Sequence, residues 1–297
     1  MTMASLTLPQ AGSVDRAERR HFIARHAGSM ILLAAIGIIF VFPIAWAALS
    51  SFKSTNDIIT GTFPLSWSSF LPLQPTFENY FYLFTELNFQ RNLLNTLIAA
   101  CGQVGIAVVA SSLAGYAFAR LRFPGSRVVF ALLLLTAFIP VEAIIVPLYR
   151  IMQWLGLVST YPALFLPFAC NPFGIFLMRQ AFRDIPLEME EAAKIDGAGP
   201  LRVFLTIALP NVKPTLATLV LIQFIWSWNA YLWPLVIMQD PNKQIAQVAI
   251  ANLKSIPNFP MDGPLFAAAT AVTIPLVILS IVLQRYYVRG LVTSGMK

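Results

Sequence analysis

Charged residues are scarce in this sequence. Lys, Arg, Asp and Glu make up 11% of its 297 residues, whereas hydrophobic residues make up 58%. Soluble domains contain about 25% charged and about 45–50% apolar residues. A water-soluble protein of this length needs a polar coat, and too little charge is present to form one. We therefore expect the apolar surface to be buried in lipid.

Histidine and cysteine are nearly absent. His21 and His26 both lie in the basic N-terminal stretch, and Cys101 and Cys170 lie in separate apolar stretches without a CxxC or Cys/His spacing. The sequence therefore has too few histidines for a histidine-based catalytic or metal site, and we predict no metal ligands. The two cysteines are expected to be packing residues.

The motifs of several enzyme classes are missing as well. The sequence contains no GxxxxGK[ST], so we do not expect the chain to hold ATP through a P-loop of its own. GxSxG, HExxH and paired carboxylates within apolar stretches are also absent, which argues against an intramembrane enzyme. We predict no catalytic residues, and no cofactor bound by this chain.

The charge balance is positive, with a net charge of +7. Nucleic-acid binding would need basic residues clustered on one face or a recognised module. The basic residues instead flank apolar runs, which is where the positive-inside bias of membrane proteins places them. We therefore expect lipid, and no nucleic acid, as a partner.

Six apolar stretches are long enough to cross a membrane, for which a helix needs about 20 residues. The first could be a signal peptide, because Ala45-Trp46-Ala47 resembles a cleavage site. Its apolar run exceeds the usual 7–15 residues or so of a signal peptide, and we interpret it as a retained helix. The predicted spans are 30–49, 92–119, 128–149, 161–178, 214–238 and 264–284.

The basic residues also predict an orientation. With six spans, 15 of the 20 Lys and Arg residues fall on the side that holds both termini and the loop between the fourth and fifth spans. The positive-inside rule places that side in the cytoplasm. The predicted fold class is an all-α integral membrane protein with six transmembrane helices. It has a cytoplasmic tail at 1–29, a six-span membrane domain at 30–284 and a second cytoplasmic tail at 285–297.

The longest external segment, 50–91, is rich in Pro, Ser and aromatic residues. One interpretation is a short interfacial helix with turns, anchored at the headgroups by Trp67, Phe70, Tyr80 and Tyr82. The other is a contact surface for an external partner. The sequence leaves both open.

The cytoplasmic loop at 184–213 is charged, unlike the stretches that flank it. Pro186 fits the first turn of a helix, followed by glutamates near the positive end of the helix dipole. Glu190 and Lys194 have the i, i+4 spacing of an ion pair on one face. The opposite, shallow apolar face is formed by Met189, Ala192 and Ala193.

A turn should follow this first helix. Gly197 can take a positive φ at the helix end, and Pro200 can begin a second short helix. Leu209-Pro210 is expected to end that helix. The loop therefore predicts a hairpin of two short helices presented to the cytoplasm.

The spacing within the hairpin resembles the EAA loop of ABC importer permeases, EAA-x3-G-x9-I-x-L-P. Every defined position matches, namely Glu191, Ala192, Ala193, Gly197, Ile207, Leu209 and Pro210. Other stretches resemble the maltose-type permeases of the carbohydrate-uptake branch. They are SFK at 51–53, GYAFARLRFPG at 115–125, WNAYLWPL at 228–235 and the ending QRYYVRGLVTSGMK.

The resemblance implies an ABC type I importer permease fold with a cytoplasmic two-helix coupling loop. In that family the EAA helices dock in a cleft of a separate ATPase and transmit its closure to the membrane helices. Carried over, Glu191 would meet a basic residue of the ATPase, Ala192 and Ala193 would permit close packing, and Gly197 would set the turn. The tail at 290–297 would also reach the ATPase dimer, although it lacks the commoner second Gly after the Lys.

The same resemblance implies the partners. ATP and Mg would be bound by two copies of a P-loop ATPase subunit, and the chain would form a heterodimer with a sister permease. An external substrate-binding protein would deliver a sugar or oligosaccharide across the cytoplasmic (inner) membrane of a bacterium or archaeon. Close relatives carry glycerol phosphate or polyols, which is the alternative. A secondary transporter is a weaker alternative, because Glu142 is the only charged residue within the predicted spans.

Polar residues within the spans are candidates for a substrate pathway, because polar groups in a membrane usually face a cavity or another helix. The candidates are Asn95, Glu142, Asn171, Trp228 and Asn229. Glu142 can equally reach the external interface, and the amides can equally bond between helices. The resemblance also implies that the sister permease makes most substrate contacts. Ser111 and Gly115, four residues apart, predict close helix packing.

Overall fold

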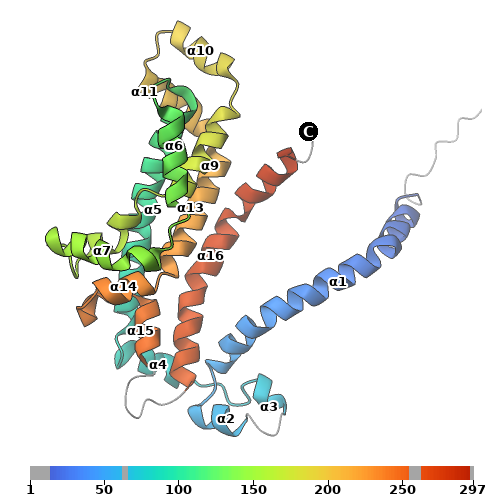
Figure 1. Ribbon diagram of the computed structural model, residues 1–297. Coiled ribbons are helices and arrows are strands. Elements are labelled where there is room, and N and C mark those ends of the chain that lie inside the picture. Colours follow the sequence, from blue (N-terminus) through green and yellow to red (C-terminus); the bar gives the residue numbers. More distant parts are fainter. Residues whose placement is uncertain (1–13, 62–65, 254–261, 295–297) are drawn as a thin grey trace, which may run out of the picture.

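The structure of the protein is a computed structural model that describes residues 14–61, 66–253 and 262–294. All regular elements within these ranges are helices, as the sequence predicts. α9 and α13 pack along α5 near the centre of an elongated bundle, and α16 lies against α13 (Figure 1). The principal helices are α1 (Val14–Ser50), α5 (Phe89–Arg120), α9 (Pro172–Arg183), α13 (Lys213–Trp228) and α16 (Gly263–Ser294).

Shorter helices occupy the two ends and one side of the bundle. The end formed by the start of α16 carries α2 (Thr55–Thr60), α3 (Trp67–Phe70) and α4 (Glu78–Thr85). The opposite end carries α10 (Leu187–Ile195), α11 (Pro200–Val203), η2 (Phe204–Ala208) and α12 (Leu209–Asn211). The remaining elements are α6 (Ser126–Thr136), α7 (Val141–Trp154), α8 (Tyr161–Phe165), η1 (Leu166–Phe168), α14 (Leu232–Ile237), η3 (Pro241–Lys243) and α15 (Ala246–Leu253).

Three described helices are long and apolar enough to cross a membrane unbroken, at Ala27–Ser50, Phe89–Arg120 and Gly263–Gln284. They correspond to the first, second and sixth predicted spans. Three further pairs of helices pass the same criterion together but are bent, which gives between three and six spans. The six predicted transmembrane helices are therefore reached only if each bent pair forms one span.

Prolines account for two of these breaks. The third predicted span is divided at Pro140, which is extended, and α6 and α7 meet at 102°. The fourth is divided before Pro172, with a bend of 52°. Proline has no N–H to continue the helical ladder and disfavours helical backbone at the preceding residue. Sequence hydropathy cannot register such a break, because the residues on both sides remain apolar.

The fifth predicted span is also interrupted. α13 ends at Trp228, and α14 begins only at Leu232. At its other end, α13 meets the helix of residues Pro200–Asn211 at 79°. The apolar window therefore covers two helices, and the hairpin leads into α13 through a sharp bend.

Small residues allow α5 and α9 to approach closely. A Cβ at Gly115 would lie 2.7 Å from the Met178 Cβ, and one at Gly174 would lie 2.5 Å from the Ser111 hydroxyl oxygen. The predicted packing at Ser111 and Gly115 is thus confirmed, and the contacting helix belongs to the same chain. Because a Cβ has no room at either glycine, these contacts fix the spacing of the two helices.

A buried lysine organises the end of the bundle near α2 and α3. Lys53 is 3% exposed, and its ammonium donates to the carbonyls of Ser68 at 2.9 Å and Ser69 at 2.8 Å. The Asn79 amide donates to the Ser51 and Lys53 carbonyls at 2.8 and 2.7 Å. Burial lowers the pKa of Lys53, and the charge of Asp57 opposes that shift. Residues 51–53 thereby hold together the segment 50–91, which the sequence predicts to be external.

α1 stands apart from the bundle over most of its length, and only the C-terminal part of α1 meets α16 (Figure 1). No residue in its apolar window is buried. The described starts and ends of the chain, in α1 and α16, both point toward the end that carries α10 (Figure 1). The predicted tails at 1–29 and 285–297 are described only in part, because residues 1–13 and 295–297 lie outside the described ranges.

Candidate functional site

α10 is the first helix of the charged hairpin. Pro186 precedes it with φ −55° and ψ 133°, so the helix begins one residue later than its sequence suggests. Glu188 and Glu190 occupy the first turn, where negative charge favours the positive end of the helix dipole. The acidic start of α10 thus follows from the local sequence.

Gly197 ends α10 in the way that the sequence predicts. Its φ is +82°, a left-handed conformation that side chains other than glycine disfavour. The Gly197 N–H donates to the Lys194 carbonyl at 3.0 Å, and the Ala198 N–H donates to the Ala193 carbonyl at 2.9 Å. These two bonds form a Schellman motif, which satisfies carbonyls at the helix end and turns the chain sharply.

The second helix of the hairpin continues past Leu209-Pro210, which corrects the prediction that it ends there. The turns before Pro210 widen into a π-helix, η2, and the helix ends at Asn211. Proline cannot donate a backbone hydrogen bond, and a π-bulge is one way a helix accommodates that loss. The Asn211 amide donates to the Ile207 carbonyl at 2.7 Å and so satisfies that group.

The residues of the motif are distributed along both helices. Glu191 and Ala192 are exposed on α10, whereas Ala193, Ile207 and Leu209 are half-buried. Several large apolar side chains of the hairpin are exposed, as expected of a surface that packs against another protein. They are Leu187, Met189, Ile195, Leu201 and Leu205.

Glu190 points into the bundle, which corrects the predicted outward pairing with Lys194. Its carboxylate is 1% exposed and lies 2.6 Å from the Arg120 Nε. The Tyr116 hydroxyl donates to the second carboxylate oxygen at 3.1 Å. Successive helical residues lie about 100° apart around the axis, so Glu190 faces the end of α5 while Glu191 remains exposed.

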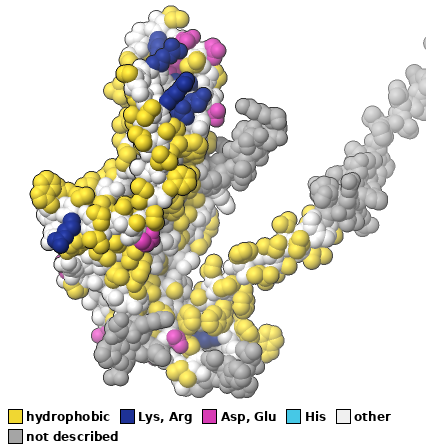
Figure 2. All heavy atoms as spheres, in the orientation of Figure 1, with side chains coloured by type: hydrophobic (Ala, Val, Ile, Leu, Met, Phe, Trp, Pro, Cys, Tyr) yellow, Lys and Arg dark blue, Asp and Glu magenta, His cyan; other side chains and the backbone are white. Residues whose placement is uncertain are grey.

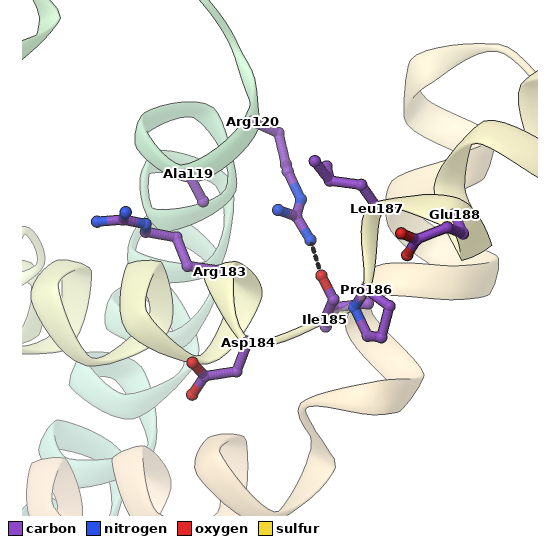
Figure 3. A pocket seen from close by; sticks show the side chains of 8 residues that line it. All are labelled: Ala119, Arg120, Arg183, Asp184, Ile185, Pro186, Leu187 and Glu188. Atoms are coloured by element: carbon purple, nitrogen blue, oxygen red, sulfur yellow. Dashed lines mark hydrogen bonds between the residues drawn. The ribbon is translucent and has the colours of Figure 1, made fainter.

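Arg120 also holds the turn that leads into α10. Its Nη2 donates to the Ile185 carbonyl at 2.6 Å, and Figure 3 shows the side chain reaching from the end of α5 toward this turn. Arg120 and Ile185 also line an open hollow of about 570 Å³. It is lined by Ala119, Arg120, Arg183, Asp184, Ile185, Pro186, Leu187 and Glu188.

Aromatic rings underlie this polar cluster. The Tyr116 ring lies 5.4 Å from Phe182 of α9 and 5.1 Å from Phe204 of η2, measured between centroids. Phe182 and Phe204 are themselves 6.0 Å apart. The three rings join α5, α9 and the second hairpin helix in one buried cluster, so the hairpin rests on a packed support.

Charged side chains gather at this end of the molecule. On the face that Figure 2 shows, Lys, Arg, Asp and Glu are concentrated around the hairpin, and the sides of the bundle are largely apolar. This distribution separates a polar end from a lipid-compatible surface.

Asn95, a candidate for the substrate pathway, is fully engaged within the chain. Its amide donates to the carbonyls of Asn242 at 3.0 Å and Gln244 at 2.9 Å, and its oxygen accepts from the Tyr161 hydroxyl at 2.7 Å. The residue therefore fastens η3 and α8 to α5. A contact with substrate stays a prediction.

Trp228 and Asn229 differ in exposure. Trp228 is buried, stacks on Phe224 at 5.2 Å, and donates its indole N–H to the Val272 carbonyl at 3.0 Å. Asn229 is exposed at the end of α13 and donates to the Ile225 carbonyl at 2.9 Å. Asn229 is thus the more accessible of the two.

Glu142 and Asn171 both lie at the breaks in predicted spans. Glu142 is exposed in the first turn of α7, and the Asn171 side chain accepts from the Gly174 N–H at 3.1 Å as the N-cap of α9. Within the described part of the chain, no hydrogen bond joins any two of the five pathway candidates. Their shared role in a pathway stays a prediction.

Sequence reasoning missed a buried amide pair. Gln103 of α5 donates to Gln223 of α13 at 3.5 Å, and both side chains are buried between the helices. Their position in otherwise apolar spans is the signal that could have identified them. In the ranges that the structure describes, no three His, Cys, Asp or Glu side chains gather closely enough to hold a metal ion.

Comparison with known proteins gives a consistent result. Residues 107–293 match the family model described as "Binding-protein-dependent transport system inner membrane component". The chain is 32% identical over 288 residues to the diacetylchitobiose uptake system permease protein NgcG of Streptomyces coelicolor, covering 96% of this chain and 92% of that protein. It is 34% identical over 265 residues to the arabinooligosaccharides transport system permease protein AraQ of Halalkalibacterium halodurans, covering 89% and 94%.

Two further relatives extend the range of similar proteins. The sn-glycerol-3-phosphate transport system permease protein UgpE of Rhizobium meliloti is 33% identical over 281 residues, covering 92% of this chain and 97% of the relative. Among solved structures, a chain of a bacterial ABC transporter involved in the import of the acidic polysaccharide alginate superposes with a TM-score of 0.76. That match has 26% identity and covers 94% of this chain and all of the other.

Proposed function

Because the chain belongs to the family of binding-protein-dependent transport system inner membrane components, we propose that it is a permease subunit of an ATP-driven importer for a sugar or oligosaccharide. The observation that carries the proposal is the two-helix hairpin at one charged end of the bundle. It exposes Glu191 and several large apolar side chains, while the opposite side of α10 is fixed to α5. Such a surface suits docking to a second protein.

The docking partner in this proposal is a separate P-loop ATPase, present in two copies, which binds ATP and Mg. Glu191 supplies negative charge to a basic residue of the ATPase, and Ala192 leaves room for its backbone to approach. The side of the membrane follows from the basic residues around the hairpin, which favour the cytoplasm. Both termini would share that side.

The mechanism in this proposal is alternating access without chemistry on this chain. Closure of the ATPase dimer moves α10, and the packed rings of Tyr116, Phe182 and Phe204 carry the movement into α5 and α9. Close packing at Gly115 and Gly174 makes α5 and α9 move together. The other half of the pathway would come from a sister permease, with an external binding protein delivering the substrate to the inner membrane.

The substrate class follows from the relatives. Two of those described above are named for the uptake of diacetylchitobiose and of arabinooligosaccharides, and the solved transporter is named for the import of alginate. One relative is named for glycerol 3-phosphate, which supports the alternative substrate. A sugar or oligosaccharide is therefore our first proposal and a glycerol phosphate the second.

The test compares Glu191→Ala with Glu188→Ala, an exposed glutamate of the same helix. The protein is purified with an N-terminal tag from its native membrane in mild detergent, and copurifying proteins are identified by mass spectrometry. We expect the wild-type chain and Glu188→Ala to retain a P-loop ATPase and a second permease. Glu191→Ala should lose most of the ATPase but keep the sister permease.

Uptake by intact cells then identifies the substrate class. Radiolabelled disaccharides and glycerol 3-phosphate are offered separately to cells that carry the wild-type chain or Glu191→Ala. If Glu191→Ala lowers the uptake of disaccharides alone, the sugar proposal is supported. If it lowers the uptake of glycerol 3-phosphate alone, the alternative is supported. A wild-type chain that copurifies with no ATPase, under conditions that preserve a known importer, would refute the proposed function.

A further inference from the structure

We propose that Glu190 and Arg120 act as positioning residues that couple α10 directly to α5, so that the two helices move as one body when the ATPase closes. This inference rests on the proposed function, which supplies the partner that moves α10. It concerns a pair of residues outside the seven matched motif positions, because Glu190 precedes the motif and Arg120 lies 70 residues earlier in the chain.

The geometry ties the hairpin to α5 at three points. Arg120 contacts one carboxylate oxygen of Glu190 at 2.6 Å, and the Tyr116 hydroxyl donates to the other at 3.1 Å. Arg120 also donates to the Ile185 carbonyl at 2.6 Å, just before α10 begins. Arg120 therefore holds both the entry to α10 and Glu190 in its first turn, and Tyr116, also on α5, fixes the same carboxylate.

Burial makes this connection stiff. The Arg120 and Glu190 side chains are 9% and 1% exposed, whereas ion pairs at a protein surface are screened by water and contribute little. Removing one partner of a buried pair leaves an uncompensated charge, which is strongly unfavourable. The pair therefore resists separation more than an exposed salt bridge would.

Glu190 and Arg120 also form the polar connection between α10 and the bundle. Among the described residues, Glu190 is the only α10 side chain with a hydrogen bond or ion pair to a helix outside the hairpin. The other charged side chains of α10, including Glu188, Glu191 and Lys194, are exposed. The chain itself leads from α10 back to α9, so Glu190 supplies the separate connection to α5.

α5 is suited to receive such a movement. It runs the length of the bundle, packs against α9 and α13, and carries Asn95 at the other end, where that residue fastens η3. A displacement applied at Arg120 therefore reaches residues near the opposite end along one continuous helix. A packed helix transmits displacement over such distances because close-packed interiors have low compressibility.

The test is a distance measurement within the complex. Spin labels replace two exposed side chains, Lys194 on α10 and Leu113 on α5, in a chain with Cys101→Ala and Cys170→Ala. The labelled complex with its ATPase is placed in nanodiscs, and the label distance is measured by pulsed electron paramagnetic resonance. It is measured without nucleotide and again after trapping with ATP and vanadate.

In the labelled chain that keeps Glu190 and Arg120, we expect the distribution of label distances to be narrow and to stay the same in both states. Glu190→Gln and Arg120→Gln should broaden it and make it shift on trapping, and each should lower transport per ATP hydrolysed at least tenfold. Glu188→Gln, on the same helix, should behave as the wild type. Since transport is expressed per ATP hydrolysed, a simple reduction in the amount of folded complex does not change this value.

Several results would overturn the inference. A change of the label distance on trapping, in the chain that keeps Glu190 and Arg120, would show that α10 moves independently of α5. This result can be obtained even if both variants fail to insert. An unchanged distance and normal coupling in Glu190→Gln would also refute it. Failure of the proposed function is seen separately, as a wild-type chain that copurifies with no ATPase before any label is introduced.

Discussion

Replacing Gly197 by Val should weaken the docking that we propose to an ATPase, without disturbing membrane insertion. The Gly197 φ of +82° is left-handed, and a residue with a Cβ pays roughly 1–2 kcal/mol there. No atom lies within 4 Å of the position a Cβ would take, so the change acts through backbone conformation and not through a clash. A cost of about 1.4 kcal/mol corresponds to a tenfold loss in affinity.

Gly199→Val is the matched control for this prediction. Gly199 also has open space around a Cβ, but its φ is −68° and its ψ 163°, which valine adopts readily. Both substitutions restrict the unfolded chain in the same way, an effect of roughly 0.4–1 kcal/mol that cancels between them. The difference between the two variants therefore isolates the left-handed conformation at the end of α10.

The assay is the affinity of the proposed ATPase partner, once purified, for each tagged variant reconstituted in nanodiscs with the proposed sister permease. We expect Gly197→Val to bind roughly 5- to 30-fold more weakly than Gly199→Val, following the cost of the left-handed conformation. Amounts of the two variants in the membrane should be equal, because the spans are unchanged. Equal affinities would refute the argument that the Schellman turn sets the docking geometry.

Three other substitutions test separate parts of the structure. Asn171→Ala removes the N-cap of α9 and should destabilise the protein by about 1 kcal/mol, measured as a lower thermal midpoint in detergent, whereas Asn171→Ser should retain most of the stability. Lys53→Met removes the bonds to the Ser68 and Ser69 carbonyls and should cost about 1–3 kcal/mol, seen as faster thermal inactivation; an unchanged rate would contradict the role given to Lys53. Asn229→Ala should change transport only modestly if the sister permease makes most substrate contacts, and a complete, substrate-selective loss of uptake would place the main contacts on this chain.

Local features of the hairpin were predictable from its sequence. A glycine after the last helical residues, with a proline three positions later, predicts the end of one helix and the start of the next, and Gly197 and Pro200 occupy these places. The apolar content likewise predicts an all-helical membrane protein. These inferences succeed because each depends on residues close together in the chain.

The orientation of Glu190 was not predictable in this way. The i, i+4 spacing to Lys194 is favourable in isolation, but Arg120, a largely buried residue 70 positions earlier in the chain, decides which way the carboxylate points. Asn95 is a similar case, because its partners are the carbonyls of Asn242 and Gln244, 147 and 149 residues away. Spacing within one helix carries no information about such contacts.

The separation of α1 from the bundle has a consequence for biosynthesis. Trp46, near the C-terminal end of α1, packs edge-to-face against Phe266, near the start of α16, with ring centroids 5.3 Å apart. More than 200 residues lie between them, which takes roughly 10–40 s to synthesise at about 5–20 residues per second. During that interval α1 can contact the segment of α3, where Trp46 donates to the Ser69 carbonyl and Phe42 lies against Phe70, but it cannot yet contact α16. The face of α1 that packs against α16 therefore stays exposed to lipid until the last described helix has been made.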